Sequence, residues 1–297
     1  MLSHHRAPSE KPNRVVVLGA AGFVGGAAVR HLTIAGIAAV ALGRKEVDLL
    51  SGNAAGALRK HLSPGDTLVF VSAKAPCKDA AMLIENVRMA GAVCEAVKGL
   101  GIAHLVYVSS DAVYKESAEP LTEASCAEPG SAHGAMHLAR EVLLRSEFTG
   151  PMAILRPTLI YGLGDPHNGY GPNRFRRLAS SGKAIMLFGE GEERRDHVSV
   201  EDVAGLLVGI IRRQSTGVLN AVSGSVASFR ELAEFTAEQF SPRVAVSGTP
   251  RSGPMPHNGY RAFDASAIAQ AFPDFRITPW REGVAAACKA EKTPTVP

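Results

Sequence analysis

The chain has 297 residues, of which 46% are hydrophobic and 20% are charged, and its formal net charge is +4. No apolar run reaches the ~20 residues that cross a bilayer, so the composition predicts a soluble globular protein without membrane association. The basic residues form no block interleaved with aromatic residues, which argues against nucleic acid as a partner. The four cysteines form no Cys-x-x-Cys pair, which is typical of reduced cysteines in a cytoplasmic protein.

The N-terminal segment, residues 1–12, has neither the apolar core of a signal peptide nor a helical periodicity. It is therefore predicted to be a disordered tail.

A glycine-rich turn follows the first apolar run, Val15–Leu18, and a helical pattern follows the turn. Gly19 permits the tight turn, Gly22 lets a phosphate approach the backbone, and Gly25 lets the helix pack closely on the strand. The free N–H groups and the positive dipole end of that helix suit a pyrophosphate. The sequence therefore predicts a dinucleotide site. The contacts expected in this turn are Gly19, Gly22, Phe23, Val24 and Gly25.

Strand and helix patterns alternate from residue 14 to about residue 160, which predicts right-handed crossovers and a parallel sheet covered on both faces. The predicted fold is α/β, a Rossmann-type doubly wound parallel sheet with a small C-terminal substrate-binding lobe. The expected parts are the nucleotide-binding domain (13–163), an insertion of the substrate lobe (164–195), a return to the domain (196–223) and the C-terminal lobe (224–290).

The end of the second predicted strand bears on the choice of dinucleotide. NAD-binding proteins usually place a carboxylate there for the ribose hydroxyls, and this strand ends in Arg44 instead. Arg44 suits a 2′-phosphate, so NADP is predicted and NAD stays possible; alternatively Arg44 only begins a surface turn. Asp48 either accepts a hydrogen bond from the adenine amine or turns the chain.

Polar side chains also follow a later buried strand, in the segment LVYVSSDAVY over residues 105–114. Ser110 and Asp111 stand at the expected ligand-binding edge of the sheet, where they could hydrogen-bond a carbonyl or hydroxyl group. Tyr114 either packs in the core or reaches the cleft as an acid.

In sequence order these pieces resemble an extended short-chain dehydrogenase/reductase of the nucleotide-sugar epimerase/dehydratase type. The matching segments are GAAGFVG (19–25), Asp48-Leu49, Asn86, SSDAVY (109–114), Glu141, LRPTLIYG (155–162) and RRDHVSVEDVA (194–204). The resemblance implies a nicotinamide cofactor, a small-molecule substrate and a homodimer formed through the helices near residues 80–98 and 133–145. It adds Leu49, Ala73 and Pro157 to the cofactor contacts, and Tyr114 and Arg195 to the substrate contacts.

The resemblance makes a nucleotide sugar a candidate substrate, because Arg195 matches the family arginine that binds its diphosphate. A smaller carbonyl compound, which would need no such contact, stays an alternative. Leu159, however, occupies a position where the family often has a substrate-binding Asn. Asp111 matches an acid of the family's dehydratases, but Ala112 replaces the Glu that follows it there, which disfavours a 4,6-dehydratase.

The family's catalytic Tyr and the Lys four residues later are both replaced. Aligning Gly134 and Glu141 with the family pattern places His133 at the Tyr position and His137 at the Lys position. Because an imidazole titrates near pH 6.5, His133 could act as general base or acid while Ser110 orients the reacting oxygen and His137 binds the ribose.

Two other hypotheses remain for this histidine pair. The redox dyad could be lost, leaving a catalytically silent NAD(P)-binding protein with a regulatory or partner-binding role. The i, i+4 spacing could also bind a metal, but the sequence offers no third ligand, so no metal is expected.

Overall fold

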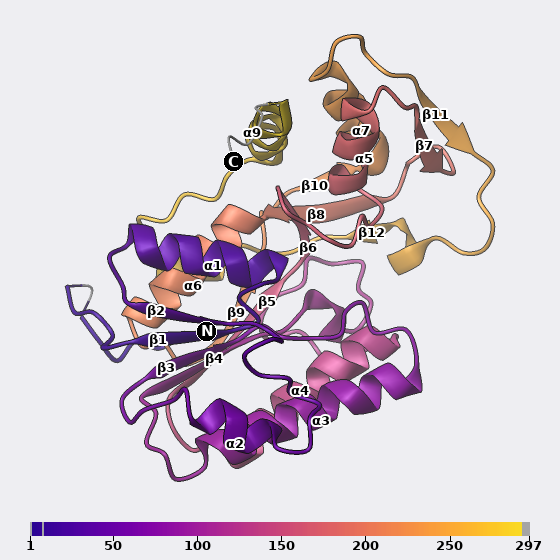
Figure 1. The fold of residues 1–297 in the computed structure, drawn as a ribbon. Helices are drawn as coiled ribbons and strands as arrows, with labels where there is room; N and C mark the ends of the chain where they lie inside the picture. The colour runs from indigo at the N-terminus through magenta and orange to yellow at the C-terminus, as the bar shows by residue number, and fades with distance from the viewer. Residues whose placement is uncertain (1, 8, 293–297) are drawn as a thin grey trace.

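A six-stranded parallel sheet forms the centre of the protein (Figure 1), as the sequence predicts. The computed structural model describes residues 2–7 and 9–292. The strands, in spatial order, are β2 (Ala39–Leu42), β1 (Val15–Leu18), β3 (Thr67–Phe70), β4 (His104–Val108), β5 (Met152–Pro157) and β9 (Gly217–Ala221). Val15 pairs with Ala39 on one side and Thr67 on the other. Since every pair is parallel, all six carboxyl ends lie at one edge of the sheet.

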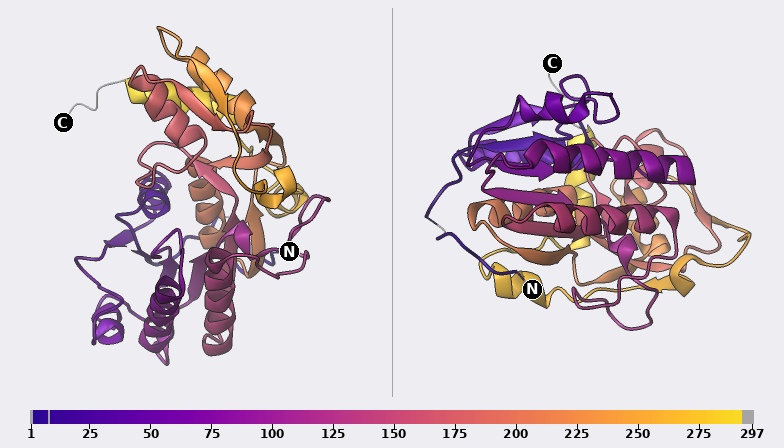
Figure 2. Two further views of the ribbon diagram at one scale, coloured as in Figure 1. Left: turned by 90° about the vertical axis from the view of Figure 1, so that its right-hand side faces the viewer. Right: turned by 90° about the horizontal axis from the view of Figure 1, so that it is seen from below.

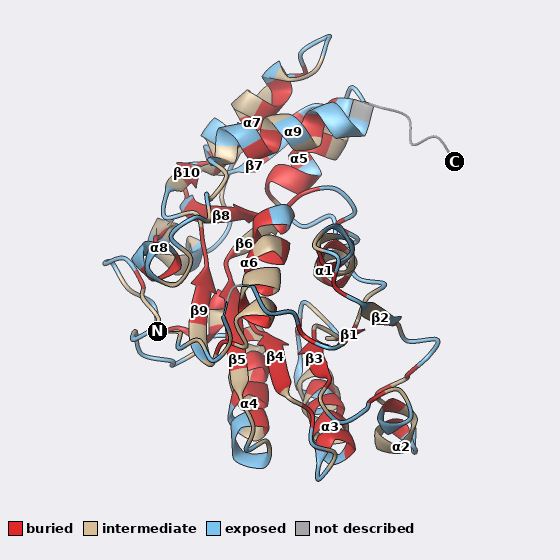
Figure 3. Cartoon of the chain, turned by 90° about the vertical axis from the view of Figure 1, so that its left-hand side faces the viewer, coloured by how far each residue is buried: buried red, intermediate tan, exposed pale blue. Residues whose placement is uncertain are grey.

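The strands are short, continuous apolar runs because helices cover both faces of the sheet. Figure 3 shows the buried interior of the sheet, where all four residues of β1 are buried. On one face lie α1 (Phe23–Ile34) and α6 (Val200–Arg212), and on the other lie α2 (Ala54–Arg59), α3 (Ala80–Val97) and α4 (Ala132–Glu147) (Figures 1 and 2). The result is the doubly wound arrangement.

A second lobe stands over the carboxyl edge of the sheet (Figures 1 and 2). Its four-stranded sheet consists of β10 (Val226–Ser228), β8 (Arg194–Ser199), β12 (Tyr260–Arg261) and β6 (Leu159–Tyr161). A two-stranded sheet pairs β7 (Ile185–Phe188) with β11 (Val246–Thr249). The lobe's helices are α5 (Pro172–Ser180), α7 (Phe229–Glu238) and α9 (Trp280–Lys292), with a 3₁₀ turn, η2, at Pro256–Gly259. The short helix α8 (Ser266–Ala271) packs near β9.

The N-terminal segment differs from the predicted disordered tail. Ser3 forms an antiparallel bridge with Thr216, and the His4 imidazole lies 2.8 Å from the Ser215 hydroxyl oxygen. Both partner residues lie in the chain between α6 and β9, so residues 2–7 are held beside β9. The prediction weighed only local periodicity, whereas this segment is ordered by partners more than 200 positions away.

None of the helices in the described part of the chain has both the length and the apolar character that a bilayer crossing requires.

A buried ion pair ties α4 to the sheet. The Arg156 guanidinium on β5 donates from Nε and Nη2 to the two carboxylate oxygens of Glu141, at 2.9 and 2.6 Å. The Ser109 hydroxyl donates a third hydrogen bond to Glu141 Oε1, at 2.6 Å. Because both charges are buried, their mutual compensation is what makes the burial tolerable.

We expect Glu141→Gln to lower the free energy of unfolding by about 3 kcal/mol, because it leaves the Arg156 charge buried without a counter-charge. Urea denaturation measures this change. Glu201→Gln is the matched control, since Glu201 pairs with Arg30 in an exposed position and its loss should cost less than about 1 kcal/mol. Equal losses for the two variants would contradict the interpretation.

Candidate active site

A cavity of about 910 Å³ lies between the carboxyl edge of the sheet and the second lobe. This volume is at the upper end of the ~300–1,000 Å³ range of ligand pockets, so it suits an extended ligand. The predicted site residues that line it are Gly19, Gly22, Phe23, Val24, Arg44, Asp48, Leu49, Ala73, Ser110, Asp111, His133, His137, Pro157 and Arg195. Gly25 and Tyr114 lie outside its lining.

The glycine turn between β1 and α1 is too tight for any other residue at two positions. Gly19 has φ +103°, and a Cβ there would lie 2.7 Å from the Ser72 backbone nitrogen. A Cβ on Gly25 would lie 2.1 Å from the Gly19 carbonyl oxygen. Gly25 therefore acts from beneath the cavity, by letting α1 reach the turn.

The N-terminus of α1 differs from those of the other long helices in this domain. Asp79, Ser131 and Ser199 cap α3, α4 and α6 with their own side chains. In α1 the N-cap is Gly22, which has no side chain, and the first turn contains no acidic residue. The amide groups at this helix end therefore remain for an anionic ligand at the cavity wall.

The far end of the cavity, after β2, carries both signs of charge. Arg44 is largely exposed and lies 3.3 Å from the Asp48 carboxylate. A hydrogen bond from the Leu50 amide, aided by Arg44, lowers the pKa of Asp48. Glu46 also folds back and accepts a hydrogen bond from the Gly43 amide at 2.8 Å. Glu46 was not among the predicted site residues, and it does not line the cavity.

Ser110 and Asp111 stand where β4 ends and a 3₁₀ turn, η1 (Asp111–Val113), begins. The Ser110 hydroxyl accepts a hydrogen bond from the Ala112 amide at 3.1 Å, which fixes the side chain at the edge of the cavity. Asp111 is held by Arg261 of the lobe, whose Nε donates to Oδ2 at 3.1 Å. This pairing makes Asp111 a link between the domain and the lobe.

The two histidines lie on one face of α4, with ring centroids 4.7 Å apart and perpendicular planes. Gly134 brings this helix against η1, because a Cβ at Gly134 would lie 1.9 Å from the Ala112 carbonyl oxygen. That close approach places His133 beside the turn that holds Ser110.

Each histidine has one ring nitrogen engaged by the protein. The Cys77 amide donates to His133 Nδ1 at 3.3 Å, and the Tyr107 hydroxyl lies 2.7 Å from His137 Nδ1. Burial lowers the pKa of His133, and the Asp111 carboxylate opposes part of that change. Burial lowers the pKa of His137 further, with contributions from His133 and Arg140. Both imidazoles are therefore uncharged at neutral pH.

On the lobe side, Arg195 lines the cavity and pairs with Glu193 at 3.1 Å. Its Nε is buried without a hydrogen-bond partner in the described chain. His197, two residues along β8, also lines the cavity and likewise has a buried, unpartnered Nε2. His197 was not predicted as a site residue, although the two-residue period of a strand places it on the same face as Arg195.

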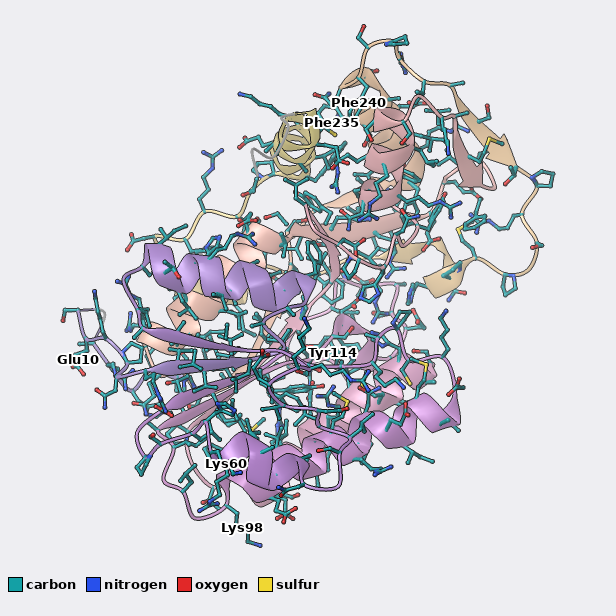
Figure 4. The ribbon with its side chains drawn as sticks, viewed as in Figure 1. Glu10, Lys60, Lys98, Tyr114, Phe235 and Phe240 are labelled. Carbon is teal, nitrogen blue, oxygen red and sulfur yellow. The ribbon has the colours of Figure 1, made fainter. Side chains whose placement is uncertain are left out.

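Tyr114 does not reach the cavity, contrary to its predicted place among the substrate contacts. It is 1% exposed, and its hydroxyl donates to the Asn220 side chain at 2.7 Å (Figure 4). The ring packs in the main hydrophobic core, and the Arg156 guanidinium lies 4.8 Å above it. Tyr114 therefore takes the packing role that the sequence left open.

The described residues contain no group of three or more His, Cys, Asp or Glu side chains with the geometry to hold a metal ion.

Residues 15–222 match the model of the NAD dependent epimerase/dehydratase family. The chain belongs to this family. The dTDP-L-rhamnose 4-epimerase of Burkholderia thailandensis is 28% identical over 200 residues, which span 54% of this chain and only 55% of that protein. The dTDP-4-dehydro-6-deoxy-D-allose reductase of Streptomyces bikiniensis is 26% identical over 287 residues, covering 80% of this chain and 82% of that protein.

Two solved structures share the fold. MoeE5 in complex with UDP-glucose and NAD has a TM-score of 0.78 and 25% identity, covering 93% of this chain and 97% of its own. The GDP-L-fucose synthetase of Naegleria fowleri bound to NADP has a TM-score of 0.83, with 97% of each chain covered, but its 16% identity bears on the fold alone.

The family's nicotinamide dinucleotide fits the site described above. The glycine turn lines the cavity at the N-terminus of α1, and because no side chain caps this helix, its first amide groups can bind a pyrophosphate there. The cavity then continues from this turn to Ser110 and His133, so one ligand can span both.

Gly25→Ala should abolish measurable binding of reduced nicotinamide cofactors in calorimetry, because the added Cβ would collide with the Gly19 carbonyl and displace α1. Gly26→Ala is the matched control, since a Cβ at Gly26 meets its nearest atom at 3.4 Å, within ordinary contact. Circular dichroism checks that both variants fold. Wild-type affinity in a folded Gly25→Ala variant would refute this role.

Proposed function

We propose that this protein is an NAD(P)-dependent oxidoreductase or epimerase acting on a hydroxyl or carbonyl group of a sugar or nucleotide sugar, with NADP as the preferred cofactor. The observation that carries the proposal is the continuity of one cavity, from the glycine turn of α1 to Ser110 and His133. When bound, the cofactor supplies reversible hydride exchange at its nicotinamide ring.

Ser110 and His133 are the groups proposed to contact the reacting oxygen. They approach it from different elements, Ser110 from the end of β4 and His133 from the first turn of α4. The Ser110 hydroxyl can orient the oxygen while the His133 imidazole hydrogen-bonds it, in the position of the family's Tyr. His137, one turn further along α4, is proposed to hydrogen-bond the ribose next to the nicotinamide, in the position of the family's Lys.

The lobe side of the cavity supports an anionic, oxygen-rich substrate. The unpartnered Nε of Arg195 is a buried donor in need of an acceptor, and a diphosphate oxygen would supply one. The named relatives act on dTDP-linked sugars, and the MoeE5 structure contains UDP-glucose. A nucleoside diphosphate sugar is therefore the proposed substrate class.

A homodimer is proposed through α3 and α4. These adjacent helices expose two large apolar side chains, Ile84 at 59% and Val142 at 60%.

His133→Ala should lower kcat by about 100-fold or more, because it removes the group that hydrogen-bonds the reacting oxygen. Turnover is followed with UDP- and dTDP-linked sugars and their 4-keto forms, by reduced-cofactor absorbance for reduction and by NMR for epimerisation. His61→Ala, which removes an imidazole outside the cavity lining, serves as the control. An unchanged rate in His133→Ala would exclude His133 from the mechanism. Cofactor binding without turnover of any of these sugars would count against catalysis itself.

Arg44→Ala should weaken NADPH binding about tenfold and leave NADH binding within about twofold, because only NADPH has a 2′-phosphate for the guanidinium. The neighbouring exposed Lys45, which does not line the cavity, gives the matched control Lys45→Ala. Calorimetric titration with both cofactors measures the change. Equal effects on the two cofactors would overturn the assignment of NADP.

A further inference from the structure

His133 and His137 share one feature: the Nδ1 atom of each ring is engaged by a group outside the cavity lining. For His133 that group is the Cys77 amide, at 3.3 Å. A backbone N–H can only donate, so His133 Nδ1 must be the acceptor and carry no proton. The single proton of the neutral ring therefore resides on Nε2.

For His137 the partner is the Tyr107 hydroxyl, at 2.7 Å, and either group could donate. Tyr107 lies in the middle of the core with 0% exposure, and burial raises the pKa of its hydroxyl, so the phenol keeps its proton. If the phenol oxygen accepted from His137 instead, that buried O–H would have no other acceptor among the hydrogen bonds of the described chain. Both groups are satisfied only if the Tyr107 hydroxyl donates to His137 Nδ1, which again leaves the ring proton on Nε2.

Arg140 strengthens this arrangement. Its guanidinium is fully buried and lies over the rings of Phe70 and Tyr107, at 4.3 and 5.1 Å from their centroids. It donates to the Ser72 carbonyl at 2.7 Å, and no carboxylate pairs with it in the described parts of the chain. This uncompensated positive charge polarises the Tyr107 O–H as a donor and opposes a second proton on His137.

We propose that Tyr107 is a positioning residue which, together with the Cys77 amide, holds His137 and His133 in their Nε2–H tautomers. The site then presents two N–H donors to its ligands where the family has a Tyr and a Lys. His137 would donate to a ribose hydroxyl and His133 to the oxygen of a bound carbonyl. The identity of these acceptors rests on the proposed function; the tautomers do not.

This tautomer restricts what the resting site can do. With its Nε2 already protonated, neutral His133 can hydrogen-bond a carbonyl oxygen but cannot accept a proton from a hydroxyl at that atom. In its resting form His133 therefore acts as a hydrogen-bond donor to the substrate oxygen and not as a base at that atom.

The test is long-range ¹H–¹⁵N correlation NMR of ¹⁵N-histidine-labelled protein at neutral pH without cofactor. His133→Gln and His137→Gln identify the two sets of signals by their loss. Both rings should show the pattern of the Nε2–H tautomer in the wild type. Tyr107→Phe should shift the His137 Nδ1 resonance, because it removes the hydrogen bond donated to that atom, while leaving His133 unchanged.

Tyr161→Phe is the matched control, because the Tyr161 hydroxyl is equally buried but has no hydrogen-bond partner in the described chain and lies outside the cavity lining. It should alter neither histidine. An Nδ1–H pattern for His137 in the wild type, or an unchanged His137 Nδ1 resonance in Tyr107→Phe, would overturn the proposal.

Cofactor affinity gives a second readout. Tyr107→Phe should weaken binding of the whole reduced cofactor about three- to tenfold, the loss of roughly one hydrogen bond, and leave binding of 2′,5′-ADP unchanged. An equal loss for both ligands would point to a general structural defect and against positioning. If the wild type binds neither ligand, the proposed function fails, whereas the tautomers are still decided by NMR.

Discussion

The close contact between Gly25 and the Gly19 carbonyl is the constraint on which the remaining site depends. It brings the N-terminus of α1 to the end of β1, at the same sheet edge where β4 and β5 deliver Ser110 and Pro157. Because parallel strands end together, residues separated by more than a hundred positions meet along one cavity. A second close contact, of Gly134 with Ala112, places the histidines of α4 on the opposite wall. Both contacts require the absence of a Cβ, so the geometry of the site is set by what these residues lack.

The fold and the position of the glycine turn could be predicted from the sequence. The alternation of apolar runs and helical patterns predicted the doubly wound sheet. The spacing of Gly19, Gly22 and Gly25 predicted a tight turn between a strand and a helix, and the structure has this turn at the cavity. Local patterns failed where distant partners decide the outcome. The N-terminal segment is ordered by Ser215 and Thr216, and Tyr114 is drawn into the core by Asn220. The hydrogen bonds on His133 and His137 involve Cys77, after β3, and Tyr107, in β4. Sequence periodicity cannot predict such contacts between distant segments.

The proposed placement of His133 and His137 where the family has Tyr and Lys agrees with the burial of this part of the cavity. A Lys ammonium needs solvent or a counter-charge, whereas a neutral imidazole tolerates the burial seen at His137. The positive charge that a Lys would contribute is present nearby in Arg140, which is buried behind the ring of Tyr107 instead of facing the ligand. In the proposed arrangement, charge and hydrogen-bond donation, which one Lys combines in the family's pattern, are divided between Arg140 and His137 of α4.

Two buried arginines on the lobe side, Arg195 and Arg261, are each neutralised by nearby carboxylates. Arg195 pairs with Glu193, and Arg261 pairs with Asp111 and Glu116, so both guanidiniums are tolerated in buried positions. Arg261 uses its charge to join the lobe to the end of β4. Arg195 keeps one buried donor that has no partner among the described residues, which costs free energy until a ligand supplies an acceptor. Arg261 therefore joins the lobe to the domain, whereas Arg195 has an unused hydrogen-bond donor. A ligand oxygen at Arg195 would accept that hydrogen bond.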